Sequence, residues 1–260
     1  GLTRYHVVYT IDSNGHRKTQ GNPAGDTWLF VGCSFTFGEG LNDDQTLPSY
    51  FSQDLGYRAN VVNAAFHGYG AHQMLHLLET NRIGGIHKPV RQVIYEAIDS
   101  HVRRSAGRAS WDLAGPNYQI DGDSVRYAGN LHGSYFITLA HIALKSDVFR
   151  YFLFRMYFDT SFDRRELEAY ARIVQQSARL VRRKYDAGFT ILLWDEDTES
   201  GRQILARLEQ TGIPIIKVSE IIPRSQWEKF KIPVDGHPAP QANRAFAAAL
   251  AKRFAVAAAN

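Results

Sequence analysis

The chain has 260 residues, of which 44% are hydrophobic and 22% are charged. This composition is typical of a globular domain with a sizeable core, and it excludes disordered, fibrous and disulfide-stapled chains. The single cysteine, Cys33, has no partner for an intramolecular disulfide, so cysteine usage does not indicate whether the protein works in an oxidising or a reducing compartment. With 30 Lys and Arg against 26 Asp and Glu, the net charge of +4 is too small to identify an anionic partner.

The first residues carry no signal peptide, and the chain begins with Gly1 instead of Met. A leading Gly is typical of a domain cut from a longer protein. No stretch approaches the roughly 18 consecutive apolar residues that a membrane-spanning helix needs. We therefore expect contact with a membrane only through a segment outside this sequence.

Short apolar runs alternate with amphipathic segments along the chain. Residues 1–26 combine an alternating run with turn chemistry, which predicts a hairpin extension of a sheet. Buried strands are expected at 27–31, 60–63, 90–98, 189–194 and 213–218. Helical spacing of apolar residues is found at 47–55, 74–78, 167–181, 204–208 and 246–254. This alternation predicts an α/β fold with a parallel sheet covered on both faces.

Residues 105–160 are longer than one crossover connection requires. They contain Gly and Asp turns at 115–117 and 121–123, and an aromatic stretch at 149–152. We interpret them as an insertion that covers or lines a site at the carboxyl edge of the sheet. Without a repeat, a low-complexity segment or a linker, residues 1–260 are expected to form a single domain.

Ser34 follows the first predicted strand and precedes a helix. In open α/β sheets, ligands bind beyond the carboxyl ends of the strands. A serine at this position exposes its hydroxyl beside free backbone N–H groups, as a nucleophile requires, although an ordinary N-cap serine fits the same pattern. The neighbouring Cys33 is interpreted as a small buried filler, with a thiol nucleophile as the alternative.

Two further segments carry residues suited to the same chemistry. Asp235 and His237 stand on a tight turn before the last helix, where a carboxylate can orient an imidazole that takes a proton from a serine. Gly68 follows the second strand and offers an unobstructed backbone N–H. Both segments also fit plain turn chemistry.

Together these blocks carry a family resemblance. Gly-x-Ser at residues 32–34, Asn-x4-Gly at 63–68 and Asp-x-His-Pro at 235–238 follow the order and spacing of the SGNH or GDSL-like hydrolase superfamily, which the chain resembles over roughly residues 25–255. The first block, residues 32–40, is most similar to domains of bacterial membrane-linked proteins that add or remove acetyl groups on polysaccharides.

The resemblance implies a three-layer α/β/α fold with a five-stranded, flavodoxin-like parallel sheet. It also implies a nucleophile at Ser34, a base at His237, and oxyanion donors in the backbone N–H groups of Ser34 and Gly68. The location itself stays undetermined, and the resemblance is compatible with a bacterial full-length protein in the periplasm or at a membrane.

Three departures from the family pattern bear on activity. The Asp that usually precedes the nucleophile is Cys33 here. The Asp that orients the histidine usually stands three residues before it, where this chain has Val234. Asp235, two residues before, is the candidate instead.

The third departure follows the third strand, where the family's oxyanion Asn is missing. Ser100 or His101 is the available donor, while Arg103 and Asp99 are candidate substrate-binding residues. The same cluster also fits a structural network that fixes the loop. Loss of one oxyanion donor costs about 2.7–4 kcal/mol in other enzymes. The sequence therefore predicts either a substitute donor or low activity.

The predicted function is a serine esterase or acyl transferase that acts on small O-acyl groups, O-acetyl on a carbohydrate, through Ser34, His237 and Asp235. Water as the acceptor makes it an esterase, and a sugar hydroxyl makes it a transferase. The alternative is a non-catalytic carbohydrate-binding module on the same fold, which the missing Asn and the aromatic insertion favour.

No cofactor, metal or nucleic-acid partner is predicted. The candidate metal ligands among the histidines lack a carboxylate-rich shell; they are His67, His72, His76 and His101. No nucleic-acid-binding module is recognisable.

Overall fold

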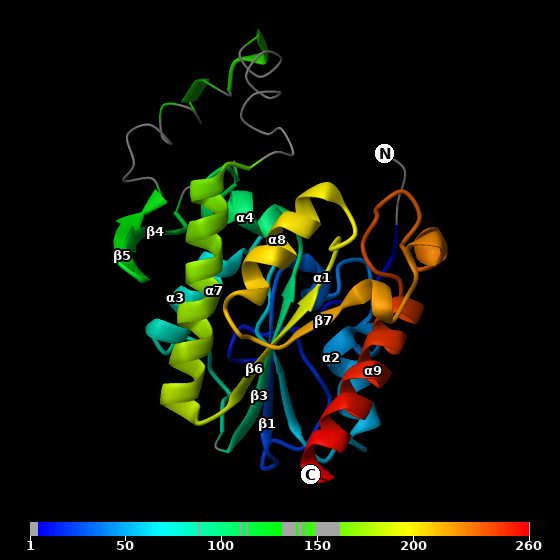
Figure 1. Ribbon diagram of the computed structural model, residues 1–260. Coiled ribbons are helices and arrows are strands. Elements are labelled where there is room, and N and C mark those ends of the chain that lie inside the picture. Colours follow the sequence, from blue (N-terminus) through cyan, green and yellow to red (C-terminus); the bar gives the residue numbers. More distant parts are fainter. Residues whose placement is uncertain are drawn as a thin grey trace.

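The computed structural model describes residues 5–87, 89–109, 111, 112, 114–131, 139, 142, 143, 145–148 and 162–259, with side chains as far as residue 255. Its centre is a parallel sheet (Figure 1). In spatial order the strands are β2 (Asn60–Asn63), β1 (Thr27–Val31), β3 (Val90–Ala97), β6 (Gly188–Leu193) and β7 (Ile215–Lys217). This is the flavodoxin-like order, so the predicted fold class is confirmed.

Helices cover both faces of the sheet (Figure 1). One face carries α3 (Ala71–Glu79), α4 (Ser100–Ser105), α7 (Arg164–Tyr185) and α8 (Glu199–Glu209), and the other carries α2 (Leu47–Asp54) and α9 (Pro240–Ala259). Alternation along β1 feeds both cores, because Leu29 and Val31 pack toward α3 and α7 whereas Phe30 packs toward α2 and α9. The sequence of β1 is therefore apolar on both faces of the sheet.

Local signals set the ends of the longer helices. Asp163 and Glu166 form a capping box at the start of α7, and Asp186 ends that helix in the left-handed conformation.

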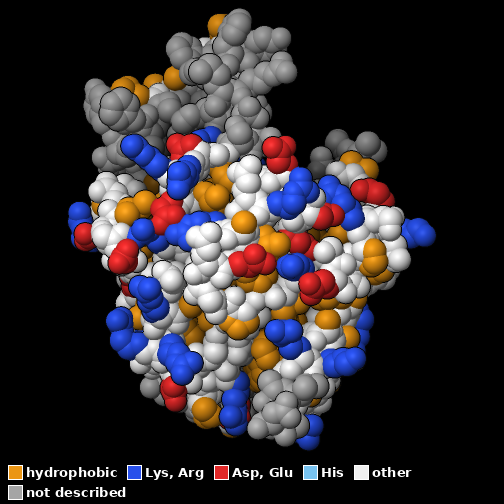
Figure 2. All heavy atoms as spheres, viewed as in Figure 1, with side chains coloured by type: hydrophobic (Ala, Val, Ile, Leu, Met, Phe, Trp, Pro, Cys, Tyr) orange, Lys and Arg blue, Asp and Glu red, His pale blue; other side chains and the backbone are white. Residues whose placement is uncertain are grey.

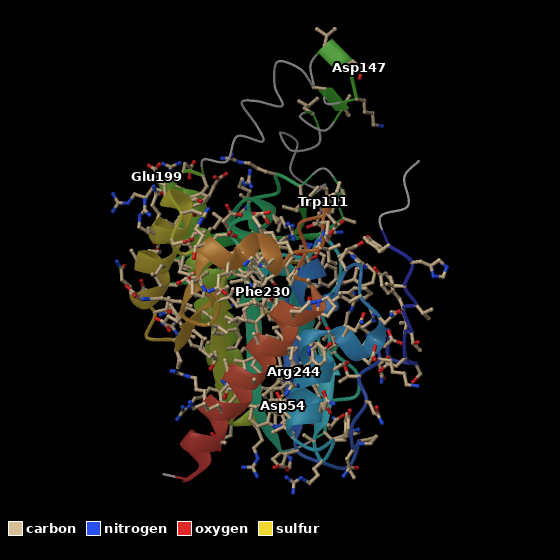
Figure 3. All side chains as sticks on the ribbon, turned by 90° about the vertical axis from the view of Figure 1, so that its right-hand side faces the viewer. Asp54, Trp111, Asp147, Glu199, Phe230 and Arg244 are labelled. Carbon is tan, nitrogen blue, oxygen red and sulfur yellow. The ribbon has the colours of Figure 1, made fainter. Side chains whose placement is uncertain are left out.

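Arg244 of α9 forms an ion pair with Asp54 at the end of α2, and the two labelled side chains lie together in Figure 3. Figure 2 shows Lys and Arg side chains scattered over the face of α7 and α8 with Asp and Glu among them, in keeping with the small net charge.

The amino-terminal segment lies beside β2. Ile11 and Arg17 form an antiparallel bridge across a turn, and Arg17 forms a second bridge with Asn63 of β2. The 105–160 segment contains an antiparallel pair absent from the expected strands, β4 (Pro116–Asp121) and β5 (Ser124–Asn130), which contacts α3 and α7. The aromatic stretch at 149–152 lies outside the described residues.

Within the described ranges, each helix is too short or too polar to cross a bilayer.

Candidate active site

Ser34 is the first residue of α1 (Ser34–Phe37), and Gly32 and Cys33 connect it to the end of β1. Cys33 occupies the N-cap position, so Ser34 is not the cap itself. The turn is tight enough to require Gly32, because a Cβ there would lie 2.1 Å from Thr36 Oγ1. As an N1 residue, Ser34 has a backbone N–H without an intrahelical acceptor. Its side chain therefore stands at the carboxyl edge of the sheet beside a free donor.

His237 brings the two ends of the chain together at this point. Its Nε2 lies 2.8 Å from Ser34 Oγ, and its Nδ1 is hydrogen-bonded to Asp235 Oδ1. A carboxylate can only accept, so Nδ1 carries the proton and Nε2 is left to accept from the serine hydroxyl. The structure thus places Ser34, His237 and Asp235 in one hydrogen-bonded chain.

The turn around Asp235 explains how an Asp two residues before His237, and not three, can reach the imidazole. Val234, at the family's usual Asp position, is 90% exposed and has a φ of 66°. The Asp235 carboxylate instead folds over the turn toward His237 and accepts from its backbone N–H at 3.3 Å as well as from its ring. The backbone N–H of Ile232 donates to the carbonyl of His237 at 2.7 Å and closes the turn.

Gly68 lies in the loop after β2 with a φ of 74°, a conformation that disfavours other residues. Its N–H has no acceptor within the described part of the chain. Trp111 lies over the same residue, with its indole N–H donating to the Gly68 carbonyl at 3.3 Å. Figure 3 shows Trp111 near the top of the molecule, above the ends of the strands.

The residues after β3 take different places. His101 is fully buried, with Nδ1 2.7 Å from the Tyr95 hydroxyl, and burial holds its pKa well below the usual value. Among the described residues, His101 forms no hydrogen bond with Ser34. The Ser100 hydroxyl is buried without a hydrogen-bond partner, again within the described ranges. A role for either residue as the substitute oxyanion donor therefore stays a prediction.

The two candidate substrate-binding residues are also part of local interactions. Asp99 accepts from Ser200 at 3.4 Å, and Arg103 belongs to the last turn of α4 and has an interaction partner. Asp99 also lies close enough to Asp195 to contribute to the raised pKa of that carboxyl, which is about 6 chiefly because of burial. The role of Asp99 and Arg103 in substrate binding therefore stays a prediction.

Arg104 was not singled out in the sequence, yet it links the two loops around Ser34. Its NH1 donates to the Tyr69 carbonyl at 2.7 Å, beside Gly68, and its guanidinium lies 5.7 Å from the Trp111 ring centre. Arg104 also faces the Cys33 thiol, whose pKa burial raises and the guanidinium partly lowers. Cys33 is fully buried, which opposes a thiol nucleophile.

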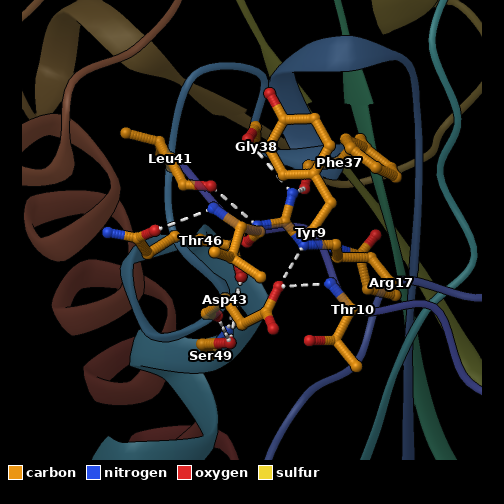
Figure 4. Close-up of polar contacts among 12 residues, drawn as sticks. Tyr9, Thr10, Arg17, Phe37, Gly38, Leu41, Asp43, Thr46 and Ser49 are labelled. Atoms are coloured by element: carbon orange, nitrogen blue, oxygen red, sulfur yellow. Dashed lines mark hydrogen bonds and ion pairs between the residues drawn. The ribbon is translucent and has the colours of Figure 1, made fainter. Parts of the chain in front are cut away.

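Arg17 is the second residue without an assigned role in the sequence. It is 1% exposed and donates to Asp43 at 2.7 Å and to the Leu41 carbonyl at 2.7 Å (Figure 4). It also reaches the carbonyls of Phe37 and Gly38, which end α1. Arg17 therefore fastens the amino-terminal ribbon to the loop that follows the nucleophile helix.

The histidines considered as metal ligands have other partners. His72 lies 2.7 Å from Asp112, His67 pairs with Glu39, and the His76 ring packs on Tyr127. The described residues contain no group of three His, Cys, Asp or Glu side chains placed to hold a metal ion.

The sheet order and helix layers define the class as the three-layer α/β fold of SGNH and GDSL-like hydrolases. A member of the lipolytic G-D-S-L family from Veillonella parvula has a TM-score of 0.52 and 11% identity over 89% of this chain and 99% of its own. The psychrotrophic esterase EstA from Pseudoalteromonas sp. has a TM-score of 0.51 and 10% identity over 90% and 100%. No protein-family model matches the sequence, and the comparison with curated proteins finds no match.

Proposed function

We propose that the protein is a serine-dependent ester hydrolase or acyl transferase. The observation that carries the proposal is the chain from Asp235 through His237 to Ser34, with 2.8 Å between His237 Nε2 and Ser34 Oγ. These are the relations that a nucleophile, its base and an orienting carboxylate need. The esterase EstA and the lipolytic G-D-S-L family member, which share the fold, support this assignment.

The reaction then proceeds in two half-steps. His237 Nε2 takes the hydroxyl proton as Ser34 Oγ attacks the ester carbonyl, and the backbone N–H groups of Ser34 and Gly68 hold the oxyanion. Collapse breaks the bond to the alcohol, which leaves with the proton from His237 and gives an acyl-serine. Water, or a second hydroxyl, repeats the sequence with His237 as base and restores Ser34.

The substrate we propose is a small O-acyl ester, O-acetyl on a carbohydrate. The resemblance of residues 32–40 to polysaccharide-acetylating domains supports the acetyl group. The exposed rings of Trp111 and Phe66, 64% and 45% exposed, support the sugar, because aromatic faces beside Gly68 offer amphipathic stacking surfaces.

A serine-directed fluorophosphonate probe tests the mechanism. EstA is described as inhibited by monoethylphosphonate, which makes this chemistry an apt choice. We expect a mass increase on the peptide containing Ser34, none in Ser34→Ala, strongly reduced labelling in His237→Ala, and unchanged labelling in Cys33→Ala. Labelling lost in Cys33→Ala but kept in Ser34→Ala would identify the thiol instead.

Acetylated and deacetylated glycans then separate the remaining functions. Acetate release supports an esterase, and acetyl transfer to an added sugar supports a transferase, each abolished by Ser34→Ala. Glycan binding that persists in both Ser34→Ala and His237→Ala, without acetate release by the wild type, would replace the proposal with a carbohydrate-binding module.

A further inference from the structure

Glu96 is a fully buried carboxylate in β3, close behind the candidate nucleophile. Its Oε2 accepts from the Thr36 hydroxyl at 2.7 Å, and its Oε1 accepts from the Trp194 indole N–H at 2.7 Å. No Lys, Arg or His contacts this carboxylate within the described ranges. A buried charge with only two neutral donors is costly, so its presence in a sheet core calls for an explanation.

The first of the two hydrogen bonds leads to Ser34. Thr36 lies two residues further along α1, is fully buried and packs against the Gly32 turn. Because α1 has only four residues, its own hydrogen bonds give it little stability. The bond from Thr36 to Glu96 therefore fixes α1, and with it Ser34, to the central strand.

The second hydrogen bond leads to His237. Trp194, at the end of β6, packs edge-on against Phe35 with ring centres 4.7 Å apart. Phe35 packs in turn against the His237 ring at 5.1 Å. The indole thus supports the surface on which the imidazole rests, and Glu96 fixes the indole.

We propose that Glu96 is a positioning residue that holds Ser34 and His237 in register by binding Thr36 and Trp194 at the same time. This inference rests on the proposed function, since it assumes that the serine and histidine react together. Glu96 touches neither reacting group and acts through its two donors.

The ionisation of Glu96 adds a signature. The groups that face it are the hydroxyl of Thr36, the indole of Trp194 and the Cys33 thiol. Burial raises the pKa of Glu96 to about 7, opposed by the two hydrogen bonds. Once Glu96 is protonated, one of its two oxygens carries a hydrogen and becomes a poorer acceptor for the N–H or O–H that donates to it. Near neutral pH the Trp194 N–H should therefore report the charge of Glu96.

Steady-state kinetics on a chromogenic acetyl ester test the positioning role. Thr36→Val keeps the shape and removes the hydroxyl, whereas Thr36→Ser keeps the hydroxyl. We expect kcat to fall about tenfold or more in Thr36→Val and Glu96→Gln, with KM within about twofold, and Thr36→Ser to stay closer to the wild type. Glu168→Gln, which removes a carboxylate paired with Arg172 and Arg207 on α7 and α8, controls for lost stability.

An NMR titration gives a readout that needs no turnover. The indole ¹⁵N–¹H signal of Trp194, assigned with Trp194→Phe, should titrate near pH 7, move to higher pH in Thr36→Val and stay flat in Glu96→Gln. If the wild type reacts at Ser34 but Thr36→Val and Glu96→Gln keep its kcat, the positioning role is wrong. If the wild type is not labelled at Ser34 at all, the proposed function fails first.

Discussion

Asp235 reaches the Nδ1 nitrogen of His237 from only two positions earlier in the chain, across Gly236 at a φ of 87°. The bond fixes the tautomer in which Nε2 accepts from Ser34. In Asp235→Asn the amide can donate to Nδ1, which moves the proton to Nε2 and removes the base. We expect kcat to fall about 10³–10⁴-fold, as when the equivalent carboxylate of another triad is amidated. Turnover of an acetyl ester checks this.

Adding Val234→Asp to Asp235→Asn provides a control. It restores the spacing common in the family, but Val234 is 90% exposed and points out of the turn. We expect no recovery of kcat. Recovery would show that the turn can rearrange to use either position.

Val234 itself is a source of strain. A β-branched residue in the left-handed region is a backbone outlier, and such residues cost on the order of 1–3 kcal/mol. Asn tolerates this conformation, so Val234→Asn should raise the free energy of unfolding by about 1 kcal/mol in urea titrations. Val8→Asn, at another exposed valine without a positive φ, should not. Destabilisation by Val234→Asn would contradict the strain.

Arg17 is expected to matter chiefly for stability. Arg17→Met leaves Asp43 and several carbonyls without their donor. Asp43 is 29% exposed, so the loss should lie below the roughly 3–5 kcal/mol of a fully buried pair but above about 1 kcal/mol. Arg91→Ala breaks an ion pair between side chains that are 60% and 38% exposed, and it should cost less than about 1 kcal/mol. Urea unfolding of both variants makes the comparison, and equal losses would refute the structural role of Arg17.

Arg104 should act on the reaction. Arg104→Ala removes the side chain that joins the Tyr69 carbonyl, next to Gly68, to Cys33, next to Ser34. Because the Gly68 N–H is then less well placed for the oxyanion, we expect kcat to fall about tenfold. Arg103→Ala, one position away on α4, should change kcat on a neutral ester much less, because the Tyr69 carbonyl keeps its hydrogen bond from Arg104. Similar losses in both variants would instead indicate a general effect on α4.

The sequence predicted the architecture because its sheet strands are short and mostly apolar and most of its longer helices have an apolar face. The last strand is shorter than expected, Ile215–Lys217 instead of 213–218, since Pro214 lacks the N–H that a ladder needs. The β4–β5 pair was missed as strands because its residues are largely exposed and polar, although its turn at 121–123 was recognised.

The candidate site also has one part that the sequence predicted and one part that it did not. Ser34, Asp235 and His237 stand in short motifs, so their chemistry shows locally. Glu96 depends on Thr36, 60 residues before it, and Trp194, 98 residues after it, and no local spacing encodes such contacts. One signal was present, because a lone Glu inside the apolar run of residues 93–98 is unusual for a buried strand.

Glu96 also predicts how stability depends on pH. Its pKa is about 7 in the fold because of burial, against 4.5 for an ordinary Glu, so between these values the folded state binds more protons than the unfolded chain. The favourable contribution of the protonated Glu96 to the free energy of unfolding is complete below pH 4.5, and it is lost as the pH rises through 7. The free energy of unfolding of the wild type, relative to Glu96→Gln, should therefore fall by about 3 kcal/mol over this range.

Urea unfolding of both proteins at several pH values measures this difference, in which the contributions of other titrating groups cancel. A difference that stays flat between pH 4.5 and 7 would contradict the buried charge. Because His237 must be neutral to act as the base, activity is compared between the wild type and Glu96→Gln at each pH. A falling stability difference, together with a ratio of wild-type to Glu96→Gln kcat that rises through pH 7, would mean that the ionised form of Glu96 is the less stable but the better aligned one, as expected where stability is exchanged for positioning.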